Sequence, residues 1–285
     1  MKLSEKGFSY CALLPMSMEQ EPSTSENNTS LQLLNEWIEI QDSLKERLIT
    51  EDGFSWKVPP IKEVAQENQD SHGGEILKYV GGVDLSFSKD DPSIACAALV
   101  VLDFSTLEVV YEDSAIVELR IPYVPGFLAF REAPVLLELL ERMKKTALPL
   151  YPQVLMVDGN GLLHPRGFGL ACHLGVMADL PTIGIGKNLH HVDGLTQSRV
   201  RQLLEDNGNS CTDILTLIGD SGSTLGAAIR STEGSLKPIF ISVGHRISLA
   251  SAVKIVKSSC RFRVPEPTRQ ADIRSKDCLR KHGLN

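Results

Sequence analysis

The sequence predicts an α/β protein whose mixed sheet has three antiparallel strands followed by parallel strands, with helices flanking it. Three β-like runs lie close together at residues 79–87, 94–103 and 108–119, and short turn clusters separate them. This spacing is typical of an antiparallel meander. Helical and strand patterns then alternate along the chain, an order that favours parallel strands within the same sheet.

The later elements can be placed from the residue pattern. Residues 127–146 carry leucines on one helical face, and the apolar run 154–157 is typical of a strand buried on both faces. The small residues of 167–178 indicate a buried helix. The remaining expected elements are a strand at 181–186, a helix at 196–206, strands at 214–219, 224–230 and 239–243, and a helix from Ser248. This order is that of a ribonuclease H-like sheet.

The two ends of the chain differ from this body. Residues 1–29 are rich in Ser, Glu, Asn and Thr, so we predict that they are disordered. A helix is expected from Ser30, and the Pro-rich polar stretch 51–75 is expected to cross the surface as a loop. The sequence therefore predicts one main domain over residues 30–275 and a basic carboxyl-terminal tail over 276–285.

The composition argues against a membrane span and against secretion. Hydrophobic residues make up 42% and charged residues 23% of the 285 residues, which is ordinary for a globular protein. Apolar runs end well before the roughly 18 residues that a membrane helix needs, and the amino terminus lacks the apolar core of a signal peptide. The six cysteines show no CxxC spacing, so we expect reduced thiols in an intracellular protein.

Charge is distributed unevenly along the chain. Residues 1–75 contain 6 Lys and Arg against 14 Asp and Glu, whereas residues 245–285 contain 10 against 3. A basic segment of this kind is compatible with binding a polyanion, although it can also be simply solvated. The side chains that would form a phosphate-contacting surface are Arg261, Arg263, Arg269, Arg274, Arg280 and Lys281.

Asp158 stands at the carboxyl end of the buried strand 154–157. In open α/β sheets this edge is where ligands bind, and Gly159 and Gly161 leave room there for a phosphate or another backbone. A carboxylate in this place is costly to desolvate unless a metal or another cation pairs with it. Asp158 is therefore a candidate functional residue.

Two further acids can reach the same place. Asp84 lies inside the first strand among apolar neighbours, so it should either shift its pKa or bind a cation, and it meets Asp158 if the two strands are adjacent. Glu132 lies near the start of the helix 127–146, where it could instead interact with the helix dipole. Three oxygen ligands without a Cys or His cluster suit Mg²⁺ or Mn²⁺. Such a metal supplies what phosphodiester hydrolysis requires, a polarised phosphate and a water of lowered pKa.

Several segments that include these acids resemble the endonuclease V family, of the animal type. They are VGGVDLSF, IPYVPGFLAFRE, VDGNGLLHPRGFGLACHLGV, PTIGIGKNL, SVGHRISL and RFRVPEPTRQAD, which occur in the family's order over roughly residues 35–275. The resemblance implies a ribonuclease H-like catalytic domain. It also implies Mg²⁺-dependent cleavage at the second phosphodiester bond 3′ to inosine, leaving 3′-hydroxyl and 5′-phosphate ends, with Mn²⁺ able to substitute.

The resemblance also assigns site residues. Asp84, Glu132 and Asp158 match the metal-binding acids of the family, and His164 and Lys187 match two further active-site positions, the lysine near the scissile phosphate. Asp272 falls where many bacterial members have His, so it is a possible active-site residue.

The loop before the helix 127–146 matches the family's wedge, which fills the gap when inosine is unstacked from a duplex. Two prolines stiffen this loop and its aromatic ring can stack on bases; outside this resemblance, the same loop would be a rigid turn. Backbone groups then face the flipped base, whose O6 accepts and N1 donates a hydrogen bond. The residues expected in these roles are Pro122, Tyr123, Val124, Pro125, Gly126, Leu128 and Gly161.

Two alternatives stay open from the sequence. A binding protein for inosine-containing RNA could keep the fold without catalysis, although it would not need all three acids. A ribonuclease H-like nuclease without base specificity would not need the wedge of Tyr123. The resemblance implies single-stranded or structured RNA and DNA with inosine as partners, no membrane, a monomer, and a location in the cytoplasm and the nucleus or nucleolus.

Overall fold

The computed structural model describes residues 25–59, 75–206, 214–232, 235 and 237–284. The chain divides into two compact units, residues 1–40 and 41–285. The helix α1 (Ser25–Lys45) begins in the first unit, five residues earlier than predicted, so residues 25–29 are helical and not disordered. The rest of the predicted disordered segment and most of the loop 51–75 fall outside the described residues. In the described part, no helix is long and apolar enough to span a membrane.

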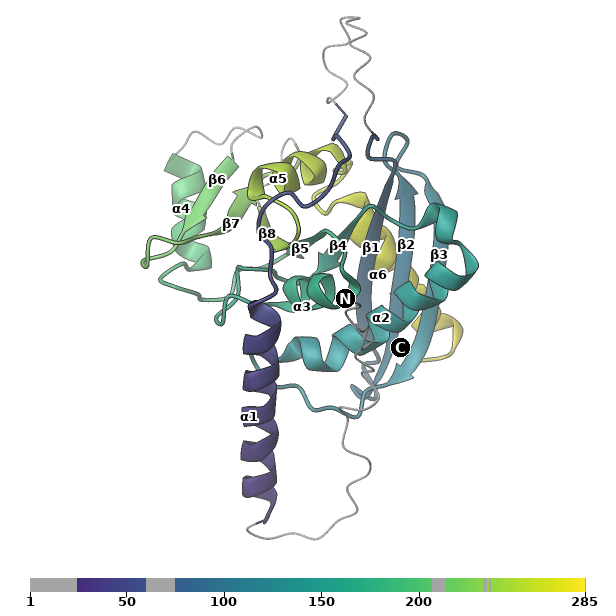
Figure 1. Ribbon diagram of the computed structural model, residues 1–285, viewed down its shortest axis with the longest axis vertical. Helices are drawn as coiled ribbons and strands as arrows, with labels where there is room; N and C mark the ends of the chain where they lie inside the picture. Colours follow the sequence, from purple (N-terminus) through teal and green to yellow (C-terminus); the bar gives the residue numbers. More distant parts are fainter. Residues whose placement is uncertain (1–24, 60–74, 207–213, 233–234, 236, 285) are drawn as a thin grey trace, which may run out of the picture. The chain divides into compact units, whose positions relative to one another are not determined.

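An eight-stranded mixed sheet forms the centre of the larger unit, in the order β3-β2-β1-β4-β5-β8-β7-β6 (Figure 1). The strands are β1 (Tyr79–Phe87), β2 (Ile94–Asp103), β3 (Val109–Glu118), β4 (Val154–Asp158), β5 (Thr182–Gly186), β6 (Ile214–Ile218), β7 (Thr224–Ile229) and β8 (Ile239–His245). The first three are antiparallel, and β4 and β5 are parallel to β1. The predicted fold class is thus confirmed. Beyond β5 the pairing is antiparallel again, whereas the alternation of helices and strands favoured parallel pairing there.

Helices cover both faces of this sheet. The helices α2 (Leu128–Thr146) and α3 (Leu170–Ala178) pack on one face, and α5 (Leu249–Ser258) and α6 (Glu266–Lys281) on the other. The remaining helices are α4 (Gln197–Asp206) and the short 3₁₀ turn η2 (Leu148–Leu150). Along β4, Val154 and Met156 face one core layer and Leu155 and Val157 the other, which explains its uninterrupted apolar run.

The helix α6 was not predicted, and it extends through residues 276–281 of the expected basic tail. Its sequence EPTRQADIRSKDCLRK has few large apolar residues, and its buried face consists mainly of small ones such as Ala271 and Ser275. Such a face fits where the helix backbone runs very close to the sheet. At Gly82 of β1, an added Cβ would lie 2.1 Å from the carbonyl oxygen of Pro267. This close approach positions the polar side chains of α6 over the end of β1.

Candidate active site

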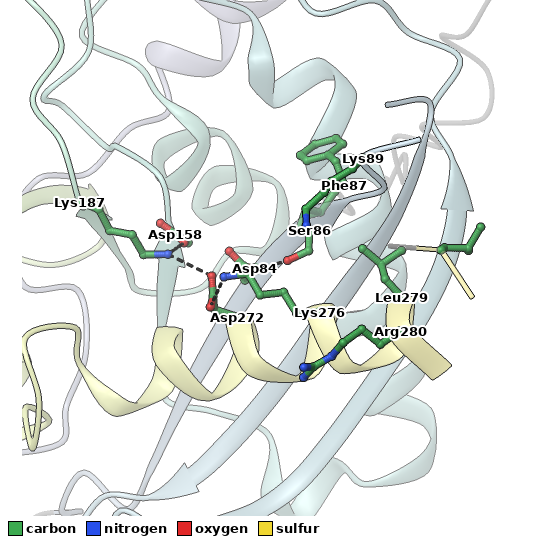
Figure 2. A pocket seen from close by; sticks show the side chains of 12 residues that line it. Asp84, Ser86, Phe87, Lys89, Asp158, Lys187, Asp272, Lys276, Leu279 and Arg280 are labelled. Atoms are coloured by element: carbon green, nitrogen blue, oxygen red, sulfur yellow. Dashed lines mark hydrogen bonds and ion pairs between the residues drawn. The ribbon is translucent and has the colours of Figure 1, made fainter. Parts of the chain in front are cut away.

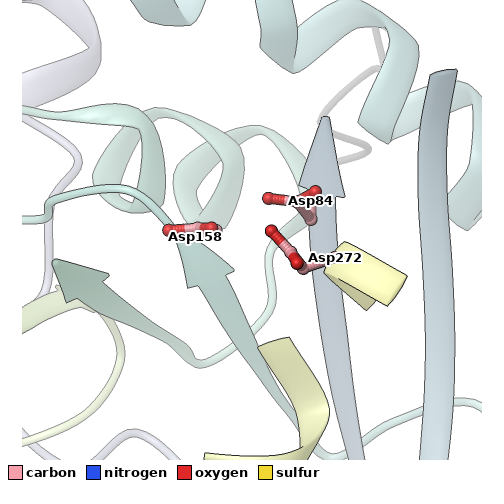
Figure 3. A group of neighbouring side chains, drawn as sticks. All are labelled: Asp84, Asp158 and Asp272. Carbon is pink, nitrogen blue, oxygen red and sulfur yellow. The ribbon is translucent and has the colours of Figure 1, made fainter. Parts of the chain in front are cut away.

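Three carboxylates from three different elements meet at the carboxyl ends of β1 and β4 (Figure 3). Asp84 comes from β1, Asp158 ends β4, and Asp272 comes from α6; one oxygen of each lies within 4.8 Å of the others. The parallel register pairs Val83 with Val157, so the next residues on both strands are the two acids. The predicted convergence of Asp84 and Asp158 therefore occurs, and Asp272 joins them. An all-oxygen donor set of this kind suits Mg²⁺ or Mn²⁺.

Asp84 has an electrostatically unfavourable environment for a negative charge. It is only 6% exposed, and burial, followed by the adjacent Asp158 carboxylate, raises its pKa to about 7. The Ser275 hydroxyl donates to its Oδ2 at 2.8 Å and partly offsets this effect. In this environment a cation or a proton has to accompany the pair of carboxylates. The need for a positive partner supports the assignment of the three acids as a metal site.

Two lysines contact the same acids (Figure 2). Lys187 follows β5, and its Nζ donates to Asp158 Oδ2 at 2.5 Å and to Asp272 Oδ1 at 3.2 Å. Lys276 of α6 donates to Asp272 Oδ2 at 2.7 Å. Burial alone would lower the pKa of Lys187, but the Asp158 and Asp272 charges raise it. Burial alone would raise the pKa of Asp272, but these two lysines lower it. The Lys187 ammonium and the Asp272 carboxylate are therefore both charged at neutral pH.

Glu132 is buried in α2, on the opposite side of the sheet from α6, and is 6% exposed. Burial and then the negative charge of Asp84 raise the pKa of Glu132 to about 8. Glu132 therefore lies close enough to the acid cluster to interact with it electrostatically. The group of acids whose oxygens lie within 4.8 Å of one another does not include it among the described residues. Direct metal binding by Glu132 thus stays a prediction.

His164 lies in the loop between β4 and α3 and is partly buried. Burial, followed by the nearby Arg166, lowers its pKa to about 4. Its Nδ1 accepts the backbone N–H of Arg166 at 3.2 Å, so in the neutral ring the proton lies on Nε2. At neutral pH His164 is therefore an uncharged hydrogen-bond donor and not a cation.

The predicted wedge loop leaves its tyrosine in solvent. Tyr123 is 62% exposed, and the φ of Gly126 is +85°, a conformation that favours glycine. Behind the loop, Gln41 at the end of α1 is only 1% exposed and donates to the carbonyl oxygens of Gly126 at 3.2 Å and Phe168 at 3.0 Å. Its own side-chain oxygen accepts from Arg166 Nε. Gln41 thus links the wedge loop to the loop of His164.

Gly161 is closely packed in the turn after β4. Its N–H donates to Ser242 Oγ at 2.8 Å, and its carbonyl oxygen accepts the N–H of Gly169 at 3.0 Å. A Cβ at this position would lie 1.9 Å from the carbonyl oxygen of Val243. These contacts show that glycine is needed here for close packing, and base recognition by Gly161 stays a prediction. Base recognition by Gly126 and Leu128 stays a prediction.

Sequence reasoning missed Gln41, Ser275 and Lys276. Each is a polar residue without a motif of its own, and each reaches the site from a helix at one end of the chain. The spacing of Asp272, Ser275 and Lys276 at i, i+3 and i+4 was the available signal, since it puts all three on one helical face.

We expect replacement of Gln41 by Ala to loosen the wedge loop. The change leaves the buried carbonyl oxygen of Phe168, the partly buried one of Gly126 and the side chain of Arg166 without this partner, so the free energy of unfolding should fall by about 2 kcal/mol. Discrimination between inosine and guanosine should fall as well. The control is Asp42→Ala, which removes only an exposed ion pair to Arg166 and should cost at most about 0.5 kcal/mol. Equal effects of the two substitutions would contradict the linking role of Gln41.

The raised pKa values of Asp84 and Glu132 predict how stability depends on pH when metal is absent. In the folded protein Asp84 and Glu132 keep their protons up to about pH 7 and 8, respectively, whereas in the unfolded chain they lose them near pH 4. Because the folded state binds more protons between these values, stability falls as the pH rises from about 4 to about 8. Three histidines, His164, His173 and His245, have pKa values lowered to about 4 and have the opposite effect, but only below about pH 6.5. Between pH 6.5 and 8, the two acids alone therefore determine how stability changes with pH.

In a chelator, the free energy of unfolding should therefore fall by about 1 to 3 kcal/mol from pH 6.5 to 8.5. Calorimetric melting curves across this range measure the change. Mg²⁺ should raise the melting temperature more at pH 8 than at pH 6.5, because it competes with protons for the same carboxylates. Glu132→Gln should flatten the slope, whereas a slope that is unaltered in this variant would contradict the assignment.

Known proteins are similar to this chain in sequence and in fold. The family model described as Endonuclease V matches residues 61–273. Endonuclease V of Mus musculus is 50% identical over 252 residues, which cover 87% of this chain and 70% of the mouse protein. The crystal structure of the catalytic domain of human Endonuclease V superposes with a TM-score of 0.81 and 47% identity, covering 89% of this chain and 99% of that one.

A third similar structure contains nucleic acid. Endonuclease V of Ciona intestinalis, in complex with a 24mer DNA containing an inosine followed by a ribo-adenosine, superposes with a TM-score of 0.77 and 34% identity. The match covers 88% of this chain and 99% of the Ciona chain.

Proposed function

This chain belongs to the Endonuclease V family of nucleases, which hydrolyse phosphodiester bonds, and we propose that it is a Mg²⁺-dependent endonuclease directed to inosine in RNA and DNA. The cut falls at the second phosphodiester bond 3′ to inosine and leaves 3′-hydroxyl and 5′-phosphate ends. The observation that carries this proposal is the meeting of Asp84, Asp158 and Asp272 beside Lys187 at the end of the sheet.

The acids fit a divalent metal by their chemistry. Asp84, Asp158 and Asp272 present oxygens within 4.8 Å of one another, and the raised pKa of Asp84 supports the binding of a positive ion there. When bound, Mg²⁺ polarises the scissile phosphate and lowers the pKa of a water, and Mn²⁺ can take its place. Glu132 either assists the metal or, because its raised pKa keeps it protonated at neutral pH, donates a proton to the leaving 3′ oxygen.

Lys187 and His164 act on the phosphate and the water. The Lys187 ammonium is held at Asp158 and Asp272 and remains charged, so it can stabilise the negative charge that develops on the phosphate. His164 is neutral, and its protonated ring nitrogen can orient the attacking water or a phosphate oxygen. Tyr123 would fill the space that a flipped inosine leaves, while the backbone of Gly126 and Leu128 reads the base.

The test of this function uses end-labelled single-stranded RNA and DNA of one sequence, each with a single inosine or with guanosine at that position. Wild-type protein with Mg²⁺ should cut only the inosine strands, one nucleotide beyond inosine. The ratio of the RNA and DNA rates gives the preferred substrate. Binding of the inosine strands without any cleavage would leave the non-catalytic binding protein as the better explanation.

A second variant separates the proposal from a nuclease without base specificity. Tyr123→Ala should lower cleavage of inosine in a duplex by about tenfold, since stacking of a base on an aromatic ring contributes about 1 to 3 kcal/mol. Tyr123→Phe keeps the ring and should retain most activity. The measurement is the single-turnover rate on duplex and single-stranded substrates, and the duplex should show the larger loss. Inosine preference that survives intact in Tyr123→Ala would favour the nonspecific nuclease.

A further inference from the structure

Two cysteines that the cleavage chemistry does not use belong to elements that pack directly on each other. Cys96 lies in β2 and is fully buried, whereas Cys278 lies in α6 and is half-buried. Both are free thiols, and α6 packs across β1 and β2. The two residues are far apart in the sequence, and the helix that carries Cys278 also carries Asp272 of the acid cluster.

The strand register places Cys96 on the face of the sheet that α6 covers. Cys96 pairs with Ser86 across β2 and β1, and residues directly opposite each other in paired strands point to the same face. The Ser86 hydroxyl lies 2.7 Å from the Ser275 hydroxyl of α6, so this face is the one toward α6. Cys278 follows Ser275 by three residues, one turn farther along the same side of the helix. The two thiols therefore meet between β2 and α6.

The surroundings of the two sulfurs differ. Burial, followed by the neighbouring Cys278 thiol, raises the pKa of Cys96 above its usual range, so Cys96 is a neutral thiol enclosed by protein. Cys278 is half-buried, and its Sγ lies 4.0 Å from His282 Nδ1. This nitrogen carries a proton, since it donates to the carbonyl oxygen of Cys278 at 2.8 Å. Of the two sulfurs, Cys278 is the one that a small oxidant in solution can reach.

We propose that Cys96 and Cys278, here called the thiol pair, are a redox-sensitive site that hydrogen peroxide converts into a disulfide joining β2 to α6. The Cys278 sulfur attacks the peroxide, so that an S–O bond forms, the O–O bond breaks and water leaves, which gives a sulfenic acid. The Cys96 sulfur then attacks the Cys278 sulfur. The S–S bond forms, the S–O bond breaks, and the thiol proton of Cys96 leaves with the oxygen as a second water.

This disulfide would fasten α6 to the sheet. The buried face of α6 consists mainly of small residues, so few large apolar side chains hold the helix in place. A covalent bond between segments that are far apart in the sequence restricts the unfolded chain and stabilises the folded one. Asp272 would then keep its position at higher temperature in the oxidised protein. The inference concerns the attachment of a helix and does not depend on the proposed cleavage reaction.

The test exposes the full chain, freed of reductant, to an equimolar amount of hydrogen peroxide and maps its peptides without reduction. A cross-linked pair of peptides that contain Cys96 and Cys278 should form, and dithiothreitol should separate them again. The melting temperature should rise by about 5 to 10 °C on oxidation. Oxidation of other cysteines without this cross-link would overturn the proposal, and this result requires no variant.

Three variants show whether the thiol pair is responsible for the rise. Cys278→Ser and Cys96→Ala should each abolish both the cross-link and the rise in melting temperature. Cys260→Ser is the matched control, because Cys260 is also half-buried but its thiol interacts with the Ser231 hydroxyl, so this variant should keep both. An equal rise on oxidation in wild type and Cys278→Ser would overturn the fastening of α6 even if the cross-link forms.

Discussion

Asp84→Asn should reduce cleavage of inosine-containing strands by at least about a hundredfold, since losing even an outer partner of a metal site typically costs 10- to 100-fold. The amide has nearly the same shape as the carboxylate, so Ser275 and Ser86 can keep their contacts by turning their hydroxyls. What the change removes is the negative charge beside Asp158. The measurement is the single-turnover rate on a single-stranded inosine substrate at saturating Mg²⁺.

The same variant should be more stable than wild type at pH 8 without metal. Burial and Asp158 raise the pKa of Asp84 to about 7, so above this pH the wild type has to accommodate an unfavourable buried charge, which the amide lacks. Mg²⁺ should then raise the melting temperature of wild type but not of Asp84→Asn. Glu205→Gln on α4, which loses only an exposed ion pair to Arg201, should resemble wild type in both assays. Normal cleavage by Asp84→Asn would contradict the placement of the metal.

The residues that the sequence allowed us to place share a local signature. Asp158 ends an apolar run of four residues, and Asp84 interrupts another. Apolar runs of this kind identify buried strands even when the neighbouring strands in the sheet are not known. Only one further step, the adjacency of β1 and β4, was needed to bring the two acids together, and the parallel register provides it. Lys187, which only the family resemblance assigned, lies at the same edge because β5 lies beside β4.

The helix α6 was harder to predict because its contacts depend on shape and not on apolar pattern. Pro267, Thr268, Ala271 and Ser275 form much of its buried face, and small or polar residues of this kind are equally common at surfaces. Their burial depends on Gly82, which lies far away in the sequence. Asp272 was identified through family resemblance alone for this reason, and Ser275 was not identified at all. Gln41 could not be identified from the sequence for a similar reason, because a single polar residue has no periodic pattern.

Gly82→Ala should therefore damage both the fold and the site from a position that bears no reactive group. An added Cβ would lie 2.1 Å from the carbonyl oxygen and 2.8 Å from the Cα of Pro267. Backbone cannot rotate away as a flexible side chain can, so either β1 or α6 has to shift. Overpacking usually costs about 1 to 3 kcal/mol, and this contact with backbone should reach about 3 kcal/mol or more.

The expected shift also separates the acids, because Asp272 and Ser275 are carried by α6 while Asp84 is carried by β1. Cleavage by the folded fraction of Gly82→Ala should fall at least tenfold, and Mg²⁺ should stabilise the variant less than wild type. Gly283→Ala is the control: it changes a glycine with a positive φ of 71° that has no atom within 4 Å of an added Cβ, so only the backbone cost of about 1 to 2 kcal/mol applies. Equal stability losses in the two variants would show that α6 can move off β1 freely. Full activity in Gly82→Ala would show that the position of Asp272 does not matter for cleavage.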